Sequence, residues 1–241
     1  MEVDEKILKD KWNQSYQRKE NYIYYPKNEI IIFLSRYIRK RIGMQKFQNI
    51  YDFSKTVKAC DYGCGIGRQT ILLKEFGIDA YGIDISQEAI KEAKYLASSL
   101  GMNLDNNLIV GDGETVPFEN NFFDFSIAES VLDSTCFQIA QSIIAELDRV
   151  TKKYCFISLI SGDYCQDPCF SDKKVTTAHE KDTIQSYYGL PKILDLIEPT
   201  QFVIKECSLV TNELMVPSNP SSTGTITKEG RYYVVLEKYK Q

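Results

Sequence analysis

The spacing of hydrophobic positions along the chain changes near residue 57. Before it, apolar residues recur at the three- and four-residue spacing of an amphipathic helix: Ile30, Phe33, Leu34, Tyr37, Ile38 and Ile42. Pro26 suits the first turn of this helix and Gly43 its end, so the pattern predicts a helix over residues 26–42. A second, more charged helix is predicted before it, near residues 3–19.

After residue 57, short β-prone runs alternate with helical patterns. The expected strands cover residues 57–61, 79–84, 108–110, 122–128, 154–160, 202–209 and 231–238. Helical patterns lie between the earlier ones, but the last two runs are joined without a helical pattern. We therefore expect an antiparallel C-terminal hairpin at the edge of an otherwise parallel sheet. The predicted fold is a doubly wound, Rossmann-like α/β sheet of seven mostly parallel strands, preceded by N-terminal helices.

This organisation fits a single domain over residues 1–241. Its expected parts are a helical N-terminal cap at residues 1–50, a cofactor-binding core at 57–160, an insert at 161–188 that forms a lid over the acceptor, and a closing helix and hairpin at 189–241. The Pro- and Ser-rich stretch at 217–224 is expected to be an exposed loop.

Composition narrows the classes of partner. The chain carries 29 Lys and Arg against 33 Asp and Glu, a formal charge of −4, so it lacks the overall positive field that would favour nucleic acid or an anionic membrane. The charged N-terminus and the lack of a long apolar run predict a cytoplasmic protein. Seven cysteines, an odd number scattered along the chain, predict reduced thiols.

A glycine-rich turn follows the first expected strand. It reads Asp61-Tyr62-Gly63-Cys64-Gly65-Ile66-Gly67, and glycines at alternate positions let the backbone turn tightly and approach a ligand closely. The spacing differs from the Gly-x-Gly-x-x-Gly of dinucleotide sites, and no Lys-Ser/Thr pair closes the turn as in a P-loop. Taken one at a time, these residues could also form a plain turn and a helix start.

Carboxylates follow each of the first three expected strands. Asp84 can accept the hydrogen bonds of a ribose diol, and Asp112 can accept one from the exocyclic amine of adenine. Together with Asp61, these acids would repel a pyrophosphate but suit a nucleoside that carries ammonium and sulfonium charges. That combination indicates S-adenosylmethionine.

The motifs together resemble those of the class I S-adenosylmethionine-dependent methyltransferases. They are Asp61-x-Gly-x-Gly-x-Gly, Tyr81-Gly82-Ile83-Asp84, Gly111-Asp112-Gly113 and Phe122-Phe123-Asp124-Phe125, and the resemblance covers residues 57–160. It implies S-adenosylmethionine as cofactor and S-adenosylhomocysteine as product. The cofactor-binding residues that it implies are Asp61, Gly63, Gly65, Gly67, Asp84, Ile85, Asp112, Gly113, Glu129 and Ser130.

The segment before the first strand is rich in aromatic residues. In proteins that this chain resembles, the corresponding segment covers the cofactor, so Tyr16 and Tyr25 are added to the expected binding residues. Packing between helices is the alternative role. Residues 22–39 also resemble bacterial methyltransferases of surface-glycan or other small-molecule biosynthesis.

The insert supplies the candidate for acceptor chemistry. His179 is the chain's single histidine; we expect it to act as general base, oriented by Glu180, with a solvated surface histidine as the alternative. Cys165 and Cys169 lack the second pair of a zinc ribbon, so no metal is expected. Ala128-Glu129-Ser130-Val131 stands where amino-directed DNA methyltransferases carry Asn/Asp-Pro-Pro-aromatic, which again argues against nucleic acid.

The sequence therefore predicts an enzyme that moves a methyl group from S-adenosylmethionine to an oxygen or nitrogen atom of a small molecule, such as a sugar or sugar-nucleotide. A non-catalytic S-adenosylmethionine-binding subunit that supports a partner protein is the alternative. An NAD-dependent oxidoreductase on the same sheet is disfavoured by the glycine spacing. The sequence does not define an oligomeric state.

Overall fold

The centre of the protein is a seven-stranded sheet with strand order β10-β11-β7-β6-β3-β4-β5. The computed structural model describes residues 5–113, 115–165, 168–216 and 225–239. The strands are β3 (Lys58–Tyr62), β4 (Asp79–Asp84), β5 (Leu108–Val110), β6 (Phe123–Ala128), β7 (Thr151–Ile160), β10 (Phe202–Val216) and β11 (Thr225–Lys238). Strands β3 to β7 are parallel, and β11 pairs antiparallel with both β7 and β10. The predicted mostly parallel sheet with a C-terminal hairpin is confirmed.

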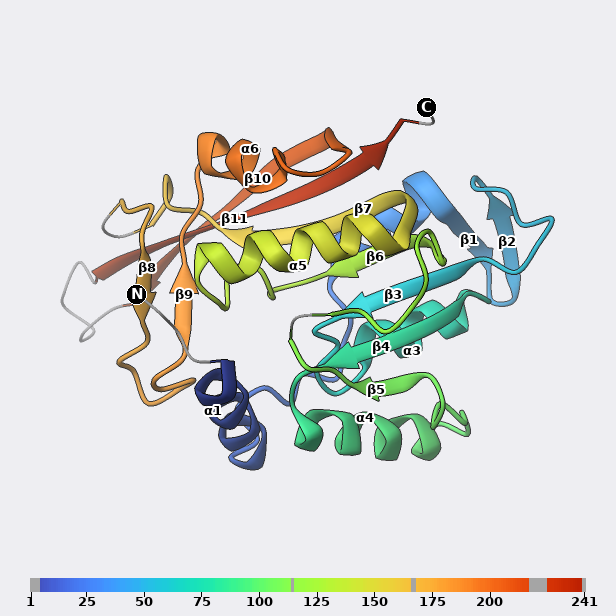
Figure 1. The fold of residues 1–241 in the computed structure, drawn as a ribbon, viewed down its shortest axis with the longest axis horizontal. Helices are drawn as coiled ribbons and strands as arrows, with labels where there is room; N and C mark the ends of the chain where they lie inside the picture. Colours follow the sequence, from blue (N-terminus) through green and yellow to red (C-terminus); the bar gives the residue numbers. More distant parts are fainter. Residues whose placement is uncertain (1–4, 114, 166–167, 217–224, 240–241) are drawn as a thin grey trace.

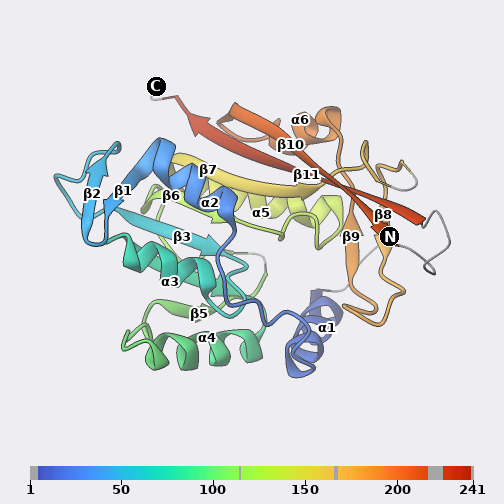
Figure 2. The ribbon, with the colours of Figure 1, turned by 180° about the vertical axis from the view of Figure 1, so that it is seen from behind.

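Helices cover both faces of this sheet, which is why its central strands are buried on both sides. One face carries α5 (Phe137–Val150) and α6 (Leu190–Ile197) (Figure 1). The other carries α2 (Asn28–Phe33) and α3 (Arg68–Glu75), seen in front in Figure 2. The helix α4 (Gln87–Ser99) packs beside α3 near the β5 edge. Every residue of β6 is buried as a result.

Residues 26–42 do not form the single helix that their spacing predicted. After α2 comes one π-helical turn (Leu34–Ile38), and then the chain becomes strand β1 (Arg39–Gly43), which pairs with β2 (Lys46–Asn49). The guanidinium groups of Arg39 and Arg41 lie 4.5 and 5.3 Å from the Phe47 ring, contacts that the hairpin allows. Gly43 lies at the β-turn, and Ile42 is largely exposed. The first 50 residues are therefore only partly helical.

The N-terminal helix α1 (Glu5–Gln17) confirms the first predicted helix and lies away from the sheet faces. In Figure 1 the parallel strands all point toward one side, and α1 lies there together with the insert. Trp12 and Tyr16 of α1 pack with Ile66 and Ala89, which joins this helix to the glycine-rich turn and to α4.

The insert after β7 contains two short antiparallel strands, β8 (Asp172–Lys174) and β9 (Ile184–Ser186). It is anchored to the start of α5, because the Asp172 carboxylate accepts a hydrogen bond from the Phe137 amide at 3.0 Å. The Ser186 amide donates to the Asp133 carbonyl at 2.8 Å. The insert therefore has a defined structure against the sheet, and its role as a lid stays a prediction.

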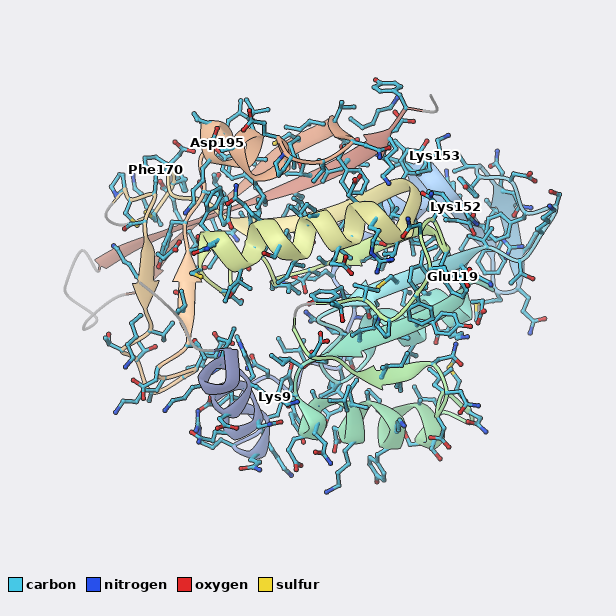
Figure 3. All side chains as sticks on the ribbon, viewed as in Figure 1. Lys9, Glu119, Lys152, Lys153, Phe170 and Asp195 are labelled. Atoms are coloured by element: carbon cyan, nitrogen blue, oxygen red, sulfur yellow. The ribbon has the colours of Figure 1, made fainter. Side chains whose placement is uncertain are left out.

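Side chains distinguish the two ends of the sheet. In Figure 3, Lys152 and Lys153 mark the start of β7, and Phe170 marks the insert at the opposite end. The six cysteines other than Cys165 are in no disulfide among the residues that the structure describes. Within the described residues, no helix combines the length and the apolar character needed to cross a bilayer. The expected loop at 217–224 lies outside those residues.

Candidate active site

Two adjoining cavities lie at the carboxyl ends of the parallel strands, where ligands bind in open α/β sheets. The first, about 750 Å³, is lined by Leu8, Trp12, Tyr16, Tyr62, Gly63, Ile83, Asp84, Ile85, Gly111, Gly113, Ser130, Val131, Ser134, Thr135, Ile139 and Ile143. The second, about 980 Å³, shares Trp12, Tyr16, Gly63, Ser130 and Ser134 with it. The first cavity is mostly apolar, whereas charged and amide side chains line the second.

The glycine-rich turn separates β3 from α3 and contributes to both cavities. Gly63 and Gly65 adopt φ angles of +68° and +55°, the left-handed region that side chains disfavour. A Cβ atom on Gly63 would lie 2.3 Å from Val131 Cγ2, and one on Gly65 would lie 2.6 Å from Tyr16 Oη. The turn therefore needs glycine for its backbone and for its close approach to α1. Gly67, at φ +82°, begins α3 and is not among the cavity-lining residues.

Asp84 closes the glycine-rich turn against the end of β4. One of its carboxylate oxygens accepts from the Gly65 amide and the other from the Ser86 amide, each at 2.8 Å. Burial raises the pKa of Asp84 to about 6, against the effect of those two hydrogen bonds. Asp84 also lines the first cavity, and each of its oxygens can accept a further hydrogen bond, as the predicted ribose contact requires.

Asp61, at the end of β3, lines the second cavity. It is 2% exposed, and its carboxylate accepts a hydrogen bond from Thr70 Oγ1 at 2.6 Å. Burial raises the pKa of Asp61 to about 7, and the Thr70 hydroxyl and the Arg68 charge counteract that rise only in part. A buried carboxyl with such a pKa would gain a strong partner in a ligand ammonium group.

The residues that follow β4 and β5 lie only in part where the sequence predicted them. Ile85 and Gly113 line the first cavity, and the Tyr62 hydroxyl donates to the Gly113 carbonyl at 3.2 Å. Asp112 is exposed, and its carboxylate accepts hydrogen bonds from the Thr115 amide and hydroxyl at 2.8 and 2.7 Å. The structure therefore places Gly111 and Gly113 at the wall of the first cavity, whereas Asp112 is not among its lining residues and its carboxylate is hydrogen-bonded to Thr115.

Glu129 and Ser130, at the end of β6, line the second cavity as a linked pair. Ser130 has a φ of +58° and its hydroxyl donates to Glu129 at 2.7 Å, while Arg68 forms an ion pair with the other Glu129 oxygen at 2.7 Å. The Arg68 guanidinium also donates to the Tyr25 carbonyl at 3.1 Å. The Arg68 guanidinium, at the start of α3, thus holds the Glu129 carboxylate at the cavity wall.

The two tyrosines predicted to cover the cofactor have different positions. Tyr16 is buried and lines both cavities, and its pKa is raised well above the usual value by burial and by the nearby Asp84 charge. The Tyr25 side chain is 84% exposed and lines neither cavity. The Tyr25 backbone carbonyl therefore accepts a hydrogen bond from Arg68, but the Tyr25 ring does not contact the site.

The insert brings His179 and Glu180 to the second cavity, together with the glycine-rich turn. His179 Nε2 lies 3.6 Å from Glu180 Oε1, and Glu180 has a φ of +54°. Burial raises the pKa of Glu180, and the proximity of His179 lowers it in part. The imidazole is more than half exposed, so its chemical role stays a prediction.

Two polar side chains in the cavities could not be identified from the sequence. Gln69 of α3 is 3% exposed and lines the second cavity, yet neither atom of its amide has a hydrogen-bond partner within the described residues. Thr135 is likewise 3% exposed and lines the first cavity, and its hydroxyl has no partner there. Buried polar groups are normally paired, so both positions fit contacts with a bound ligand. Among the residues that the structure describes, no cluster of His, Cys, Asp and Glu is arranged to hold a metal ion.

The strand order and the cavities at the carboxyl ends of the parallel strands define a Rossmann-like α/β domain. Residues 60–158 match the family model described as a methyltransferase domain. The matched region is thus similar to a methyltransferase domain, and solved S-adenosylmethionine-dependent methyltransferases share the fold of the chain.

Known proteins resemble the chain over its core. It is 31% identical over 108 residues to norajmaline N-methyltransferase of Rauvolfia serpentina, covering 44% of this chain and 36% of that protein. Among solved structures, magnesium protoporphyrin IX methyltransferase of Synechocystis PCC 6803 with bound S-adenosylmethionine superimposes with a TM-score of 0.63 at 15% identity, covering 99% of both chains. A methyltransferase of Methanosarcina mazei gives 0.58 at 20% identity, covering 78% of this chain and 95% of that one. The chain spans little more than a third of the norajmaline enzyme.

Proposed function

We propose that the protein is an enzyme that transfers the methyl group of S-adenosylmethionine to an oxygen or nitrogen atom of a small molecule, such as a sugar or sugar-nucleotide. One observation carries the proposal: the glycine-rich turn places Asp61 and Asp84 in adjoining cavities, the first largely apolar and the second charged. This arrangement suits a ligand with a nucleoside at one end and an amino acid at the other.

The residues would divide the cofactor between the cavities. Asp84 would accept from the ribose hydroxyls, with Ile85, Val131 and Ile143 around the base. Asp61 would pair with the amino group, and the unpaired Gln69 amide would bond the polar end of the ligand. When bound, S-adenosylmethionine supplies an already activated methyl group, so the protein's main work is alignment and removal of a proton from the acceptor.

Binding of the cofactor product is the first test. Calorimetric titration of the full chain with S-adenosylhomocysteine should show micromolar affinity, and NAD should show none. Binding of NAD alone would contradict the proposal and favour an oxidoreductase. Tight S-adenosylhomocysteine binding without acceptor-dependent methyl transfer in a metabolite screen would favour the non-catalytic subunit.

The affinity for S-adenosylhomocysteine should depend on pH. Because the pKa of Asp61 is about 7, the carboxyl is mostly neutral at pH 6 and mostly charged at pH 8, and only the charged form attracts the ligand ammonium group. We expect binding to strengthen about tenfold from pH 6 to pH 8. Asp61→Asn should bind more weakly and lose most of this dependence. An unchanged slope in that variant would remove Asp61 from the ammonium site.

His179→Ala should lower the turnover number at least tenfold and leave S-adenosylhomocysteine affinity within twofold, because His179 is proposed to take a proton from the acceptor. Turnover would be measured as transfer of labelled methyl to the acceptor found in the screen. Lys181→Ala, a nearby exposed change in the same insert, is the control. Equal turnover in both variants would show that His179 is a surface residue.

A further inference from the structure

A third cavity opens on the second one at the start of β11. It has a volume of about 1190 Å³, and its wall includes Tyr164, Tyr187 and Tyr233. Four residues line both the second and the third cavity: Lys27, Ile160, Gln185 and Arg231. These four residues, here called the junction, come from segments far apart in sequence. A molecule that reached from the third cavity toward the glycine-rich turn would pass them.

Arg231 presents free donors at the junction. Its Nη1 atom donates to Asp133 at 2.6 Å and to Ser158 Oγ at 3.3 Å, which fixes the guanidinium against a fully buried carboxylate. Within the described part of the chain, its Nε and Nη2 atoms have no hydrogen-bond partner. Arginine offers five N–H donors in a planar fork, so several remain for a ligand.

Lys27 and Gln185 add to this donor set. Over the residues that the structure describes, the Lys27 ammonium has neither an ion-pair nor a hydrogen-bond partner. The Lys27 side chain is half-buried. The Gln185 carbonyl oxygen accepts from the Tyr187 hydroxyl at 3.3 Å, which leaves the amide nitrogen as a donor. Asp133 offsets the charge of Arg231, whereas nothing described offsets that of Lys27.

The nearby acidic side chains have partners of their own. In the second cavity, Glu129 is paired with Arg68 and its charge also acts on Arg231, Glu180 lies beside His179, and Asp61 accepts a hydrogen bond from Thr70. In the third, Glu229 is exposed. The junction therefore presents unpaired hydrogen-bond donors and the unpaired Lys27 ammonium group between the two cavities.

We propose that the junction binds the anionic group, a carboxylate or a phosphate, of a ring-bearing methyl acceptor. The ring lies among the tyrosines of the third cavity, whose flat faces suit an aromatic or sugar ring. Lys27 supplies charge, and Arg231 and Gln185 supply directed hydrogen bonds. This inference rests on the proposed function, because it assigns the acceptor side of the same site.

The test uses the full chain saturated with S-adenosylhomocysteine, so that cofactor binding is measured first. Benzoate, phenyl phosphate and neutral benzyl alcohol are then titrated and followed by NMR shifts of the labelled protein. We expect at least one anion to bind tenfold or more tightly than the alcohol. The preferred anion distinguishes a carboxylate from a phosphate acceptor.

Two variants locate the effect. Lys27→Met should weaken binding of the preferred anion at least fivefold and leave benzyl alcohol and S-adenosylhomocysteine unchanged. Lys55→Met makes the same charge change before β3, at the opposite end of the sheet, and should have no effect. Gln185→Leu should weaken the anion about threefold without changing the charge.

Three outcomes would overturn the inference while leaving the proposed function intact. They are binding of none of the three probes, equal binding of anions and alcohol, and loss of S-adenosylhomocysteine affinity in Lys27→Met with unchanged anion binding. The last would assign Lys27 to the cofactor. If S-adenosylhomocysteine itself does not bind the unmodified chain, the proposed function fails instead.

Discussion

Replacing Asp84 with alanine is expected to weaken binding of S-adenosylhomocysteine at least 100-fold. The carboxylate holds the Gly65 amide at 2.8 Å and so fixes the glycine-rich turn, and it is also the proposed acceptor for the ribose hydroxyls. Hydrogen bonds to a charged group contribute about 1.5–3 kcal/mol each, so loss of two accounts for this factor. Because burial already raises the pKa of Asp84 to about 6, a neutral residue there should not prevent folding.

Calorimetry on folded variants checks this prediction. Asp84→Asn keeps one acceptor oxygen and should lose about tenfold in affinity. Asp79→Ala is the matched control: Asp79 begins the same strand, where it forms an ion pair with Lys74 at 2.7 Å, far from the glycine-rich turn. A folded Asp84→Ala protein whose affinity for S-adenosylhomocysteine lay within threefold of that of the unmodified chain would contradict the assignment of the ribose site.

Asp133→Ala is expected to lower the free energy of unfolding by about 3–5 kcal/mol, the usual cost of breaking a buried ion pair from one side. Asp133 is fully buried, and one of its oxygens accepts from Arg231 at 2.6 Å and from the Ile160 amide at 2.9 Å. Its removal leaves the Ile160 N–H without a partner and the Arg231 charge without its ion-pair partner, with the Ser158 hydroxyl and the Glu129 charge remaining nearby. Because Arg231 lies in β11 and Ile160 ends β7, the change acts where the C-terminal hairpin joins the sheet.

Urea denaturation would measure the loss. Asp195→Ala removes an exposed carboxylate from α6, on the outer side of the molecule in Figure 3, and should change stability by less than about 0.5 kcal/mol. The double variant Asp133→Ala, Arg231→Met removes both charges and should recover part of the stability. Equal losses in the two single variants would mean that the buried pair contributes nothing beyond an ordinary surface change.

Much of the sheet could be predicted because its signals are local. Runs such as Phe122 to Ala128 are rich in apolar and aromatic residues typical of strands, and the glycines at 63 and 65 need conformations that few other residues adopt. The helix prediction over residues 26–42 was wrong in its second half. Ile38 and Ile42 have helical spacing, but a strand with exposed Ile42 satisfies the same sequence once Arg39 and Arg41 pack on Phe47.

The sequence predicts more of the cofactor side of the site than of the acceptor side. Asp61 and Asp84 stand directly after strands, and parallel strands bring their ends together. Lys27 and Arg231 carry no such signal, because only the antiparallel insertion of β11 and the path of the chain before α2 place them at one point. Tyr25 illustrates the converse: an aromatic-rich segment does not say which ring faces inward.

The position of β11 sets the order in which the protein can assemble during synthesis. This strand lies between β7 and β10, and β10 is hydrogen-bonded in the sheet through β11. While β11 is still within the ribosome, β7 is therefore an open sheet edge, a kind of surface that favours aggregation. The parallel strands can pair beforehand, since their contacts are complete by Ile160. A nascent chain can thus pair its parallel strands early and acquires Arg231 only when β11 is added.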